Sequence, residues 1–159
     1  MPMPPLPPAG SEAHPAPGHP PDKLSVLVFS GQFERVHYAL VLASAAAAIG
    51  TPATLFFTDQ ALRALLEAGP EGPGWRMLPS TDGRQGGAID DERRGRGIAG
   101  FEELLSACGE LGVRIIVCEM GLRAIGLEAS ALRSDLPTEV AGVVTFLADA
   151  SATGSLLSL

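Results

Sequence analysis

Short apolar runs rich in β-branched residues recur along this chain and alternate with segments of helical pattern. The runs cover residues 24–29, 53–57, 113–118 and 140–144, with a last one near 155–159. They are continuously apolar rather than alternating, which is typical of strands buried on both faces of a sheet. Helices are predicted at 34–49, 60–68 (with Asp59 as N-cap), 101–111, about 121–133 and around 146–150. Because strands that alternate with helices pair in parallel through right-handed crossovers, the sequence predicts a three-layer α/β/α sandwich with a mostly parallel sheet of about five strands.

Two stretches fall outside this pattern. Residues 1–22 hold nine of the fourteen prolines, so we expect a disordered proline-rich tail ahead of an α/β domain over 23–159. Residues 69–100 are dense in glycine and charge and have no sustained period, which predicts a long loop. The apolar residues of this loop, expected to dock on the body or on a neighbouring subunit, are Trp75, Met77 and Leu78.

Composition excludes several classes of function. The chain is 46% apolar and carries a formal net charge of −7, which fits a globular protein and argues against nucleic acid as a partner. The longest apolar stretch, 38–49, is well short of the ~20 residues of a membrane span. The N-terminus does not have the pattern of a secretory signal, so we expect a cytoplasmic protein. With two cysteines and no metal-ligand spacing, neither a disulfide framework nor a metal or cofactor is expected.

Chemistry in open parallel sheets collects beyond the carboxyl ends of the strands. Those ends are predicted at Ser30-Gly31-Gln32, at Thr58-Asp59 and at Cys118-Glu119-Met120. Cys118 ends the clearest strand just ahead of a predicted helix, where unpaired backbone N–H groups favour the thiolate. A partly exposed thiol there is suited to attack a sulfane sulfur, whereas a buried one would be a small hydrophobic residue only.

The other candidate residues have plainer interpretations. Cys108 shares a helix face with Leu104 and Leu111, which predicts a core position rather than a resolving thiol. His37 is expected to be a half-exposed helix residue without a triad partner. The turn after the first strand could bind phosphate, but no phosphate-binding glycine pattern is present. The arginines expected to form a solvated charged loop, with nearby acidic residues cancelling much of their charge, are Arg84, Arg93, Arg94 and Arg96.

Three segments together resemble the DsrE/DsrF-like family of sulfur-relay proteins. They are residues 117–121 (VCEMG), 125–126 (IG) and 141–147 (AGVVTFL), and the likeness runs from about residue 23 to 159. The resemblance implies that Cys118 carries a persulfide between a rhodanese-type or TusA-type sulfur carrier and downstream enzymes, without a cofactor, in a homo-oligomer. The branch it most resembles tends to have serine where Gly121 stands here. Backbone N–H groups could replace that hydroxyl, since glycine permits close approach.

Three hypotheses follow. The first is a sulfur carrier, a possible sulfurtransferase, that holds a persulfide on Cys118. Its supporting pocket is predicted to consist of Met120, Gly121, Ser30 and Gly31. The second is a non-catalytic binding or assembly module in which Cys118 is buried and inert and the 69–100 loop carries the interaction. The third is peroxide-type redox chemistry at Cys118, which would form a sulfenate.

Overall fold

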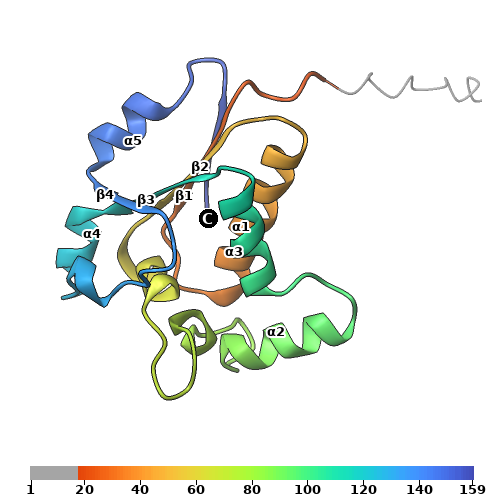
Figure 1. Cartoon of the computed structure of the whole chain (residues 1–159), viewed down its shortest axis with the longest axis vertical. Coiled ribbons are helices and arrows are strands. Elements are labelled where there is room, and N and C mark those ends of the chain that lie inside the picture. The colour runs from red at the N-terminus through yellow and green to blue at the C-terminus, as the bar shows by residue number, and fades with distance from the viewer. Residues whose placement is uncertain (1–17) are drawn as a thin grey trace, which may run out of the picture.

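The computed structural model describes residues 18–159, and the predicted tail lies mostly outside them. Five parallel strands form one sheet in the order β4-β3-β2-β1-β5 (Figure 1). The strands are β1 (Leu24–Val28), β2 (Ala53–Phe57), β3 (Arg114–Cys118), β4 (Thr138–Ala141) and β5 (Ser155–Ser158). Helices lie on both sides of this sheet, so the predicted α/β/α sandwich is confirmed.

The helices differ greatly in length and in how firmly they pack. The α-helices are α1 (Phe33–Ala48), α2 (Gly86–Gly95), α3 (Phe101–Glu110), α4 (Glu119–Ala124) and α5 (Val143–Asp149). Three 3₁₀-helices are η1 (Asp59–Leu65), η2 (Gly74–Met77) and η3 (Ala129–Ala131). In Figure 1, α1 and α3 lie together on one side of the strands and α5 lies on the other. No helix in residues 18–159 has the length and apolar character to cross a membrane.

One face of the sheet carries the main core, and we call it the helical face. It is the face toward which Val26, Leu55 and Ile115 point, and α1 and α3 cover it. Each large side chain buried there contributes roughly 1.5–3 kcal/mol. Most of the apolar surface that the fold removes from water is therefore on this side.

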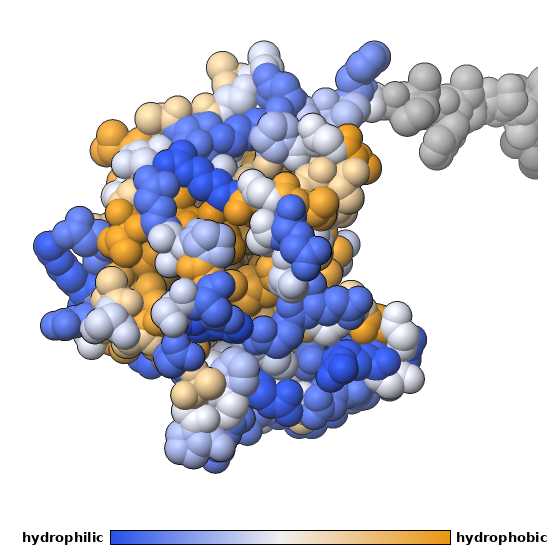
Figure 2. Space-filling view, in the orientation of Figure 1, coloured by the Kyte–Doolittle hydropathy of each residue, from blue (hydrophilic) through white to orange (hydrophobic). Residues whose placement is uncertain are grey.

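The opposite face, here called the open face, has much thinner cover. Leu27, Phe56, Ile116 and Cys118 point to it, since successive strand residues alternate between the two faces. Of the residues in α5, only Phe146 is buried. Val143, Val144 and Leu147 of α5 are exposed, as are Phe29 after β1, Met120 in α4 and Leu156 in β5. Figure 2 shows hydrophobic surface in the middle of the visible side of the molecule, surrounded by hydrophilic residues.

Residues 69–100 are not the long loop that the sequence predicted, because they contain η2 and α2. The sequence pattern does not predict α2, because two glycines and a run of charged residues interrupt its helical periodicity. A Cβ on Gly86 would lie 2.6 Å from the Phe33 ring and 2.7 Å from the Trp75 carbonyl oxygen, so close packing requires glycine here. Tertiary contacts hold the helix in place: Ile89 is buried, and the buried Asp90 accepts a hydrogen bond of 2.7 Å from the Phe101 N–H.

Other boundaries also differ from the predictions. The segment predicted as a helix at 60–68 is the 3₁₀-helix η1, and Thr58, not Asp59, is its N-cap. Asp59 instead has φ +50° and accepts a hydrogen bond from the N–H of Gln60. The helix predicted at 121–133 is two pieces, α4 and η3. The predicted strand at 140–144 ends at Ala141, because Gly142 caps α5.

Candidate functional site

Cys118 lies at the carboxyl edge of the sheet between two specific neighbours. The register pairs Cys118 with Ala141 on β4, and it pairs Phe57 with Val117 on β3. Continued by one residue, the second pairing puts Thr58 level with Cys118. Side chains alternate along a strand, so Thr58 points to the open face as Cys118 does. The edge therefore carries a row, Ala141, Cys118 and Thr58, on one face.

The Cys118 side chain is buried, with 2% of the residue exposed. It belongs to a small hydrophobic cluster with Phe56, Ile116 and Phe146, which we call the cysteine cluster. Of the two alternatives that the sequence left open for this thiol, the structure has the buried one. The physical reason is the turn at Gly142, which sends α5 back over the sheet and brings Phe146 onto Phe56.

A backbone N–H contacts the sulfur in the place where the resembling branch has a serine hydroxyl. The N–H of Gly121 donates to the Cys118 Sγ at 3.3 Å. A Cβ on Gly121 would overlap the Thr58 Oγ1 and lie 2.7 Å from the Asp59 nitrogen. The glycine thus permits the approach that the sequence suggested, and it brings the chain after β2 against the turn that follows Cys118.

The structure brings together only part of the predicted supporting pocket. Gly121 contacts the sulfur, but Met120 is 70% exposed. Ser30 and Gly31 follow β1, which is separated from β3 by β2. Ser30 Oγ accepts a hydrogen bond from Gln32, and a Cβ on Gly31 would meet Gln60.

Thr58 and Phe146 are among the neighbours of Cys118 that sequence reasoning did not assign to the site. Thr58 stood among the predicted strand ends, but only the register shows that it shares a row with Cys118. Phe146 lay in a predicted helix whose position over the sheet the sequence could not give.

Glu119 is held away from the sulfur by an ion pair. Its Oε1 accepts a 2.5 Å hydrogen bond from the Arg123 guanidinium one turn later, and both side chains are exposed. The carboxylate is therefore paired at the surface of α4.

Cys108 is a core residue, as predicted. Its Sγ donates to the Leu40 carbonyl oxygen at 3.7 Å, and burial raises the pKa of this thiol to about 11. Cys108 packs in the core of the helical face, whereas Cys118 belongs to the open face. The sheet therefore lies between the two thiols, which excludes a disulfide between them in this fold.

His37 differs from its prediction, because it is buried rather than half-exposed. Its Nε2 lies 2.9 Å from the Ala99 carbonyl oxygen and its Nδ1 lies 3.3 Å from the Arg93 guanidinium. Burial lowers the pKa of His37. A neutral imidazole, donating from Nε2 and accepting at Nδ1, satisfies both contacts and ties α1 to the segment after α2.

Trp75 docks on the body of its own chain. Its indole N–H donates to Glu102 at 2.6 Å, and its ring stacks on Phe101 with centroids 4.8 Å apart. Leu78 is also buried, whereas Met77 stays 45% exposed. Of the four arginines predicted as a charged loop, Arg93 and Arg94 lie in α2. Arg84 forms ion pairs with Asp82 and Glu92, and Arg96 forms one with Glu92.

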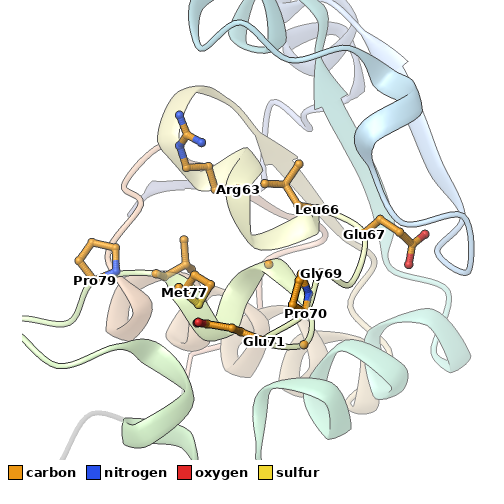
Figure 3. Close-up of a pocket in the computed structure, with 11 residues that line it drawn as sticks. Arg63, Leu66, Glu67, Gly69, Pro70, Glu71, Met77 and Pro79 are labelled. Carbon is orange, nitrogen blue, oxygen red and sulfur yellow. The ribbon is translucent and has the colours of Figure 1, made fainter.

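A cavity of about 460 Å³ lies beside η1 and η2. In Figure 3, Leu66, Met77 and Pro79 face it, while the charged end of Glu67 points away. None of its lining residues belongs to the cysteine cluster. The cavity is therefore separate from the sulfur.

Comparison with known proteins gives consistent matches. The model of the DsrE/DsrF-like family matches residues 23–155. The sulfur carrier protein DsrE2 of Allochromatium vinosum is 30% identical over 118 residues, which cover 62% of this chain and 74% of that protein. An uncharacterized protein of Bacillus subtilis, YrkE, is 25% identical over 147 residues, which cover 80% of this chain and 91% of that protein.

A solved structure has the same fold. The crystal structure of the ychN protein from E. coli matches with a TM-score of 0.51 and 14% identity, covering 86% of this chain and 99% of that one. At this identity the likeness shows the fold alone. The family match spans the chain from β1 to the start of β5 and includes the turn at Cys118. This chain therefore belongs to the DsrE/DsrF-like family.

Proposed function

We propose that this protein is a sulfur carrier that holds a persulfide on Cys118 and passes the outer sulfur to a partner protein. The observation that carries the proposal is the N–H of Gly121 at 3.3 Å from the Cys118 Sγ, at the carboxyl edge of a parallel sheet. The backbone N–H is a hydrogen-bond donor to the sulfur, and the thiolate is the nucleophilic form of cysteine. The likeness to a protein named as a sulfur carrier supports the same role.

The chemistry needs only thiols and persulfides. In loading, the Cys118 thiolate attacks the outer sulfur of a donor persulfide, R–S–SH. A bond forms between Cys118 and that sulfur, the donor's S–S bond breaks, and R–S⁻ leaves as a thiolate. In delivery, an acceptor thiolate attacks the outer sulfur of Cys118–S–SH and releases the Cys118 thiolate. Sulfur moves between thiols without an external oxidant or reductant.

The burial of Cys118 means that the open face must loosen before a donor can reach the sulfur. The cover is slight, because Phe146 is the one buried residue of α5. Segments with few buried contacts open at a lower free energy than the whole fold. The proposal therefore includes a local movement of α5 that exposes Cys118 to the partner.

Loading with a defined donor tests the proposal. Purified protein is incubated with glutathione persulfide, freed of excess donor and weighed by intact-mass spectrometry. We expect a gain of one sulfur atom in the wild type and in Cys108→Ala, and no gain in Cys118→Ser. Absence of loading in the wild type, or equal loading in Cys118→Ser, would refute the carrier role.

A second function is favoured by the 2% exposure of Cys118. In it, the chain is a binding or assembly module, and the thiol only packs against Phe56, Ile116 and Phe146. Labelling with a maleimide under native conditions separates the two. A carrier labels at Cys118 on a time scale set by local opening, whereas an inert module labels at neither cysteine until it is denatured.

A homo-oligomer is part of the proposal. Large exposed apolar areas mark interaction surfaces, and Val144 and Leu147 are 77% and 58% exposed on α5. Light scattering on a sizing column should give more than one subunit for the wild type and a smaller species for Leu147→Lys. Ile49→Lys, at another exposed apolar residue, after α1, is the matched control and should not change the mass. A monomeric wild type would contradict this part.

Partners of the TusA or rhodanese type fit a carrier that exchanges sulfur between thiols. The cytoplasm, where thiols stay reduced, suits such exchange. Delivery from a loaded carrier domain of either type to Cys118, followed by mass spectrometry of both proteins, tests the choice of partner.

A further inference from the structure

Thr58 and Cys118 are neighbours on the open face, at the ends of adjacent strands. Phe56 pairs with Ile116 and Phe57 with Val117, so the next pair in register is Thr58 with Cys118. Adjacent strands lie about 4.8 Å apart, and side chains on one face at the same level are in contact range. The Thr58 N–H donates to the Val28 carbonyl oxygen at 3.0 Å, which keeps Thr58 in line with β2 beyond the end of the strand.

Gly121 lies against both of these residues. Its N–H lies 3.3 Å from the Cys118 sulfur, while a Cβ on the same residue would overlap the Thr58 hydroxyl oxygen. The hydroxyl and the sulfur therefore both lie against the backbone of one glycine. Thr58 after β2, Cys118 in β3 and Gly121 in α4 thus meet at the carboxyl edge of the sheet.

The Thr58 hydroxyl is available as a donor there. None of the side-chain hydrogen bonds in residues 18–159 involves its oxygen, and Thr58 is half-buried. The other neighbours of the sulfur, Ile116, Phe146 and Ala141, offer only carbon atoms. Of the side chains around Cys118, Thr58 is thus the one that can donate a hydrogen bond.

We propose that the Thr58 hydroxyl binds the outer sulfur of the Cys118 persulfide; this rests on the proposed function. The outer sulfur of a persulfide lies about 2.05 Å beyond Sγ, and Thr58, beside the buried Cys118, is half-buried. At neutral pH the persulfide carries its charge on this outer atom. A hydroxyl donor stabilises that anion while the Gly121 N–H stays on the inner sulfur.

Thr58→Val and Thr58→Ser separate the hydroxyl from the shape of the side chain. Each protein is loaded with glutathione persulfide, freed of donor, and followed by mass spectrometry as the persulfide decays. We expect the half-life to fall about tenfold in Thr58→Val, the factor that loss of a hydrogen bond to a charged group produces. Thr58→Ser should retain the wild-type half-life, because it keeps the donor.

The matched control is Thr138→Val, which removes the hydroxyl of another half-buried threonine, at the amino end of β4 and directed to the helical face. Its half-life should equal that of the wild type. Equal half-lives for Thr58→Val and the wild type would overturn the inference and leave the carrier role intact. A wild type that does not load overturns both. Urea unfolding of all variants shows whether a change in half-life merely follows stability.

Discussion

Phe146 lies over Phe56 with the ring centroids 4.7 Å apart and the ring planes inclined by 15°. This stack joins α5 to the open face, because Phe146 is the one buried residue of the helix. The same two rings, with Ile116, form the cysteine cluster around Cys118. Access to the sulfur and attachment of α5 therefore depend on one contact.

Phe146→Ala should make Cys118 more reactive toward a maleimide. Removing the ring should destabilise the fold by about 3 kcal/mol and lower the free energy of local opening. If opening becomes easier by about 1.4 kcal/mol, native labelling of Cys118 speeds up about tenfold. The labelling rate, measured by mass spectrometry after digestion, checks this.

Ile49→Ala is the control, since Ile49 is an exposed apolar residue after α1 and lies outside the α5 surface proposed for the oligomer. It should change neither stability nor labelling rate appreciably. An unchanged labelling rate in Phe146→Ala would mean that another part of the chain closes the site.

Asp149 fixes the other end of α5 to the sheet. Its carboxylate accepts 2.6 Å contacts from Thr54, Lys23 and Arg114, and its side chain is 12% exposed. Asp149→Asn should lower the free energy of unfolding by about 1–3 kcal/mol, because hydrogen bonds to a charged group are lost. Asp91→Asn, which breaks the surface pair with Arg76, should cost less than about 1 kcal/mol. Urea denaturation compares the two.

The contribution of Asp149 should depend on pH. Burial alone would raise the pKa of Asp149, but the hydrogen bonds from Lys23, Thr54 and Arg114 outweigh it and hold the pKa below its ordinary value. A lowered pKa in the fold means that the stabilisation is complete above the unfolded value of about 3.9 and is lost as the pH falls through the folded value. Unfolding measured from about pH 6 down to about pH 3 should therefore show a smaller loss of stability in Asp149→Asn than in the wild type. An equal loss of unfolding free energy in the wild type and in Asp149→Asn over this pH range would exclude a pH-dependent contribution of Asp149.

The strands could be predicted from the sequence because continuous apolar runs have few alternatives in a chain of this kind. The parallel sheet followed from their alternation with helices, and Cys118 at its carboxyl edge followed from both. Helix α2 could not be predicted, since Gly86 and Gly87 oppose helix formation locally and tertiary packing decides the outcome. The burial of Cys118 and its pairing with Thr58 depend on where α5 folds back and on strand register, which no local pattern contains.

Gly121→Ala should destabilise the protein, because a Cβ would overlap the Thr58 hydroxyl and crowd the Asp59 nitrogen. Crowding of this kind costs about 1–3 kcal/mol. Gly109→Ala is the matched control, since Gly109 lies inside α3 with nothing within 4 Å of an added Cβ. Alanine there should stabilise the helix by up to about 1 kcal/mol. The changes in the free energy of unfolding, measured with heat or urea, should therefore have opposite signs in the two variants. A Gly121→Ala variant with unchanged stability would show that the carboxyl edge of the sheet relaxes around the added Cβ.

Cys108 should limit stability at alkaline pH. Burial raises the pKa of its thiol from 9.0 to about 11, so the fold favours the neutral form. A raised pKa means that the stabilisation is fully present below the unfolded value and is lost as the pH rises through the folded value. Between these two values the wild type should lose free energy of unfolding with each step in pH, and Cys108→Ala, which has no thiol to ionise at this position, should lose less. An unchanged slope in Cys108→Ala would show that another group carries the alkaline loss of stability.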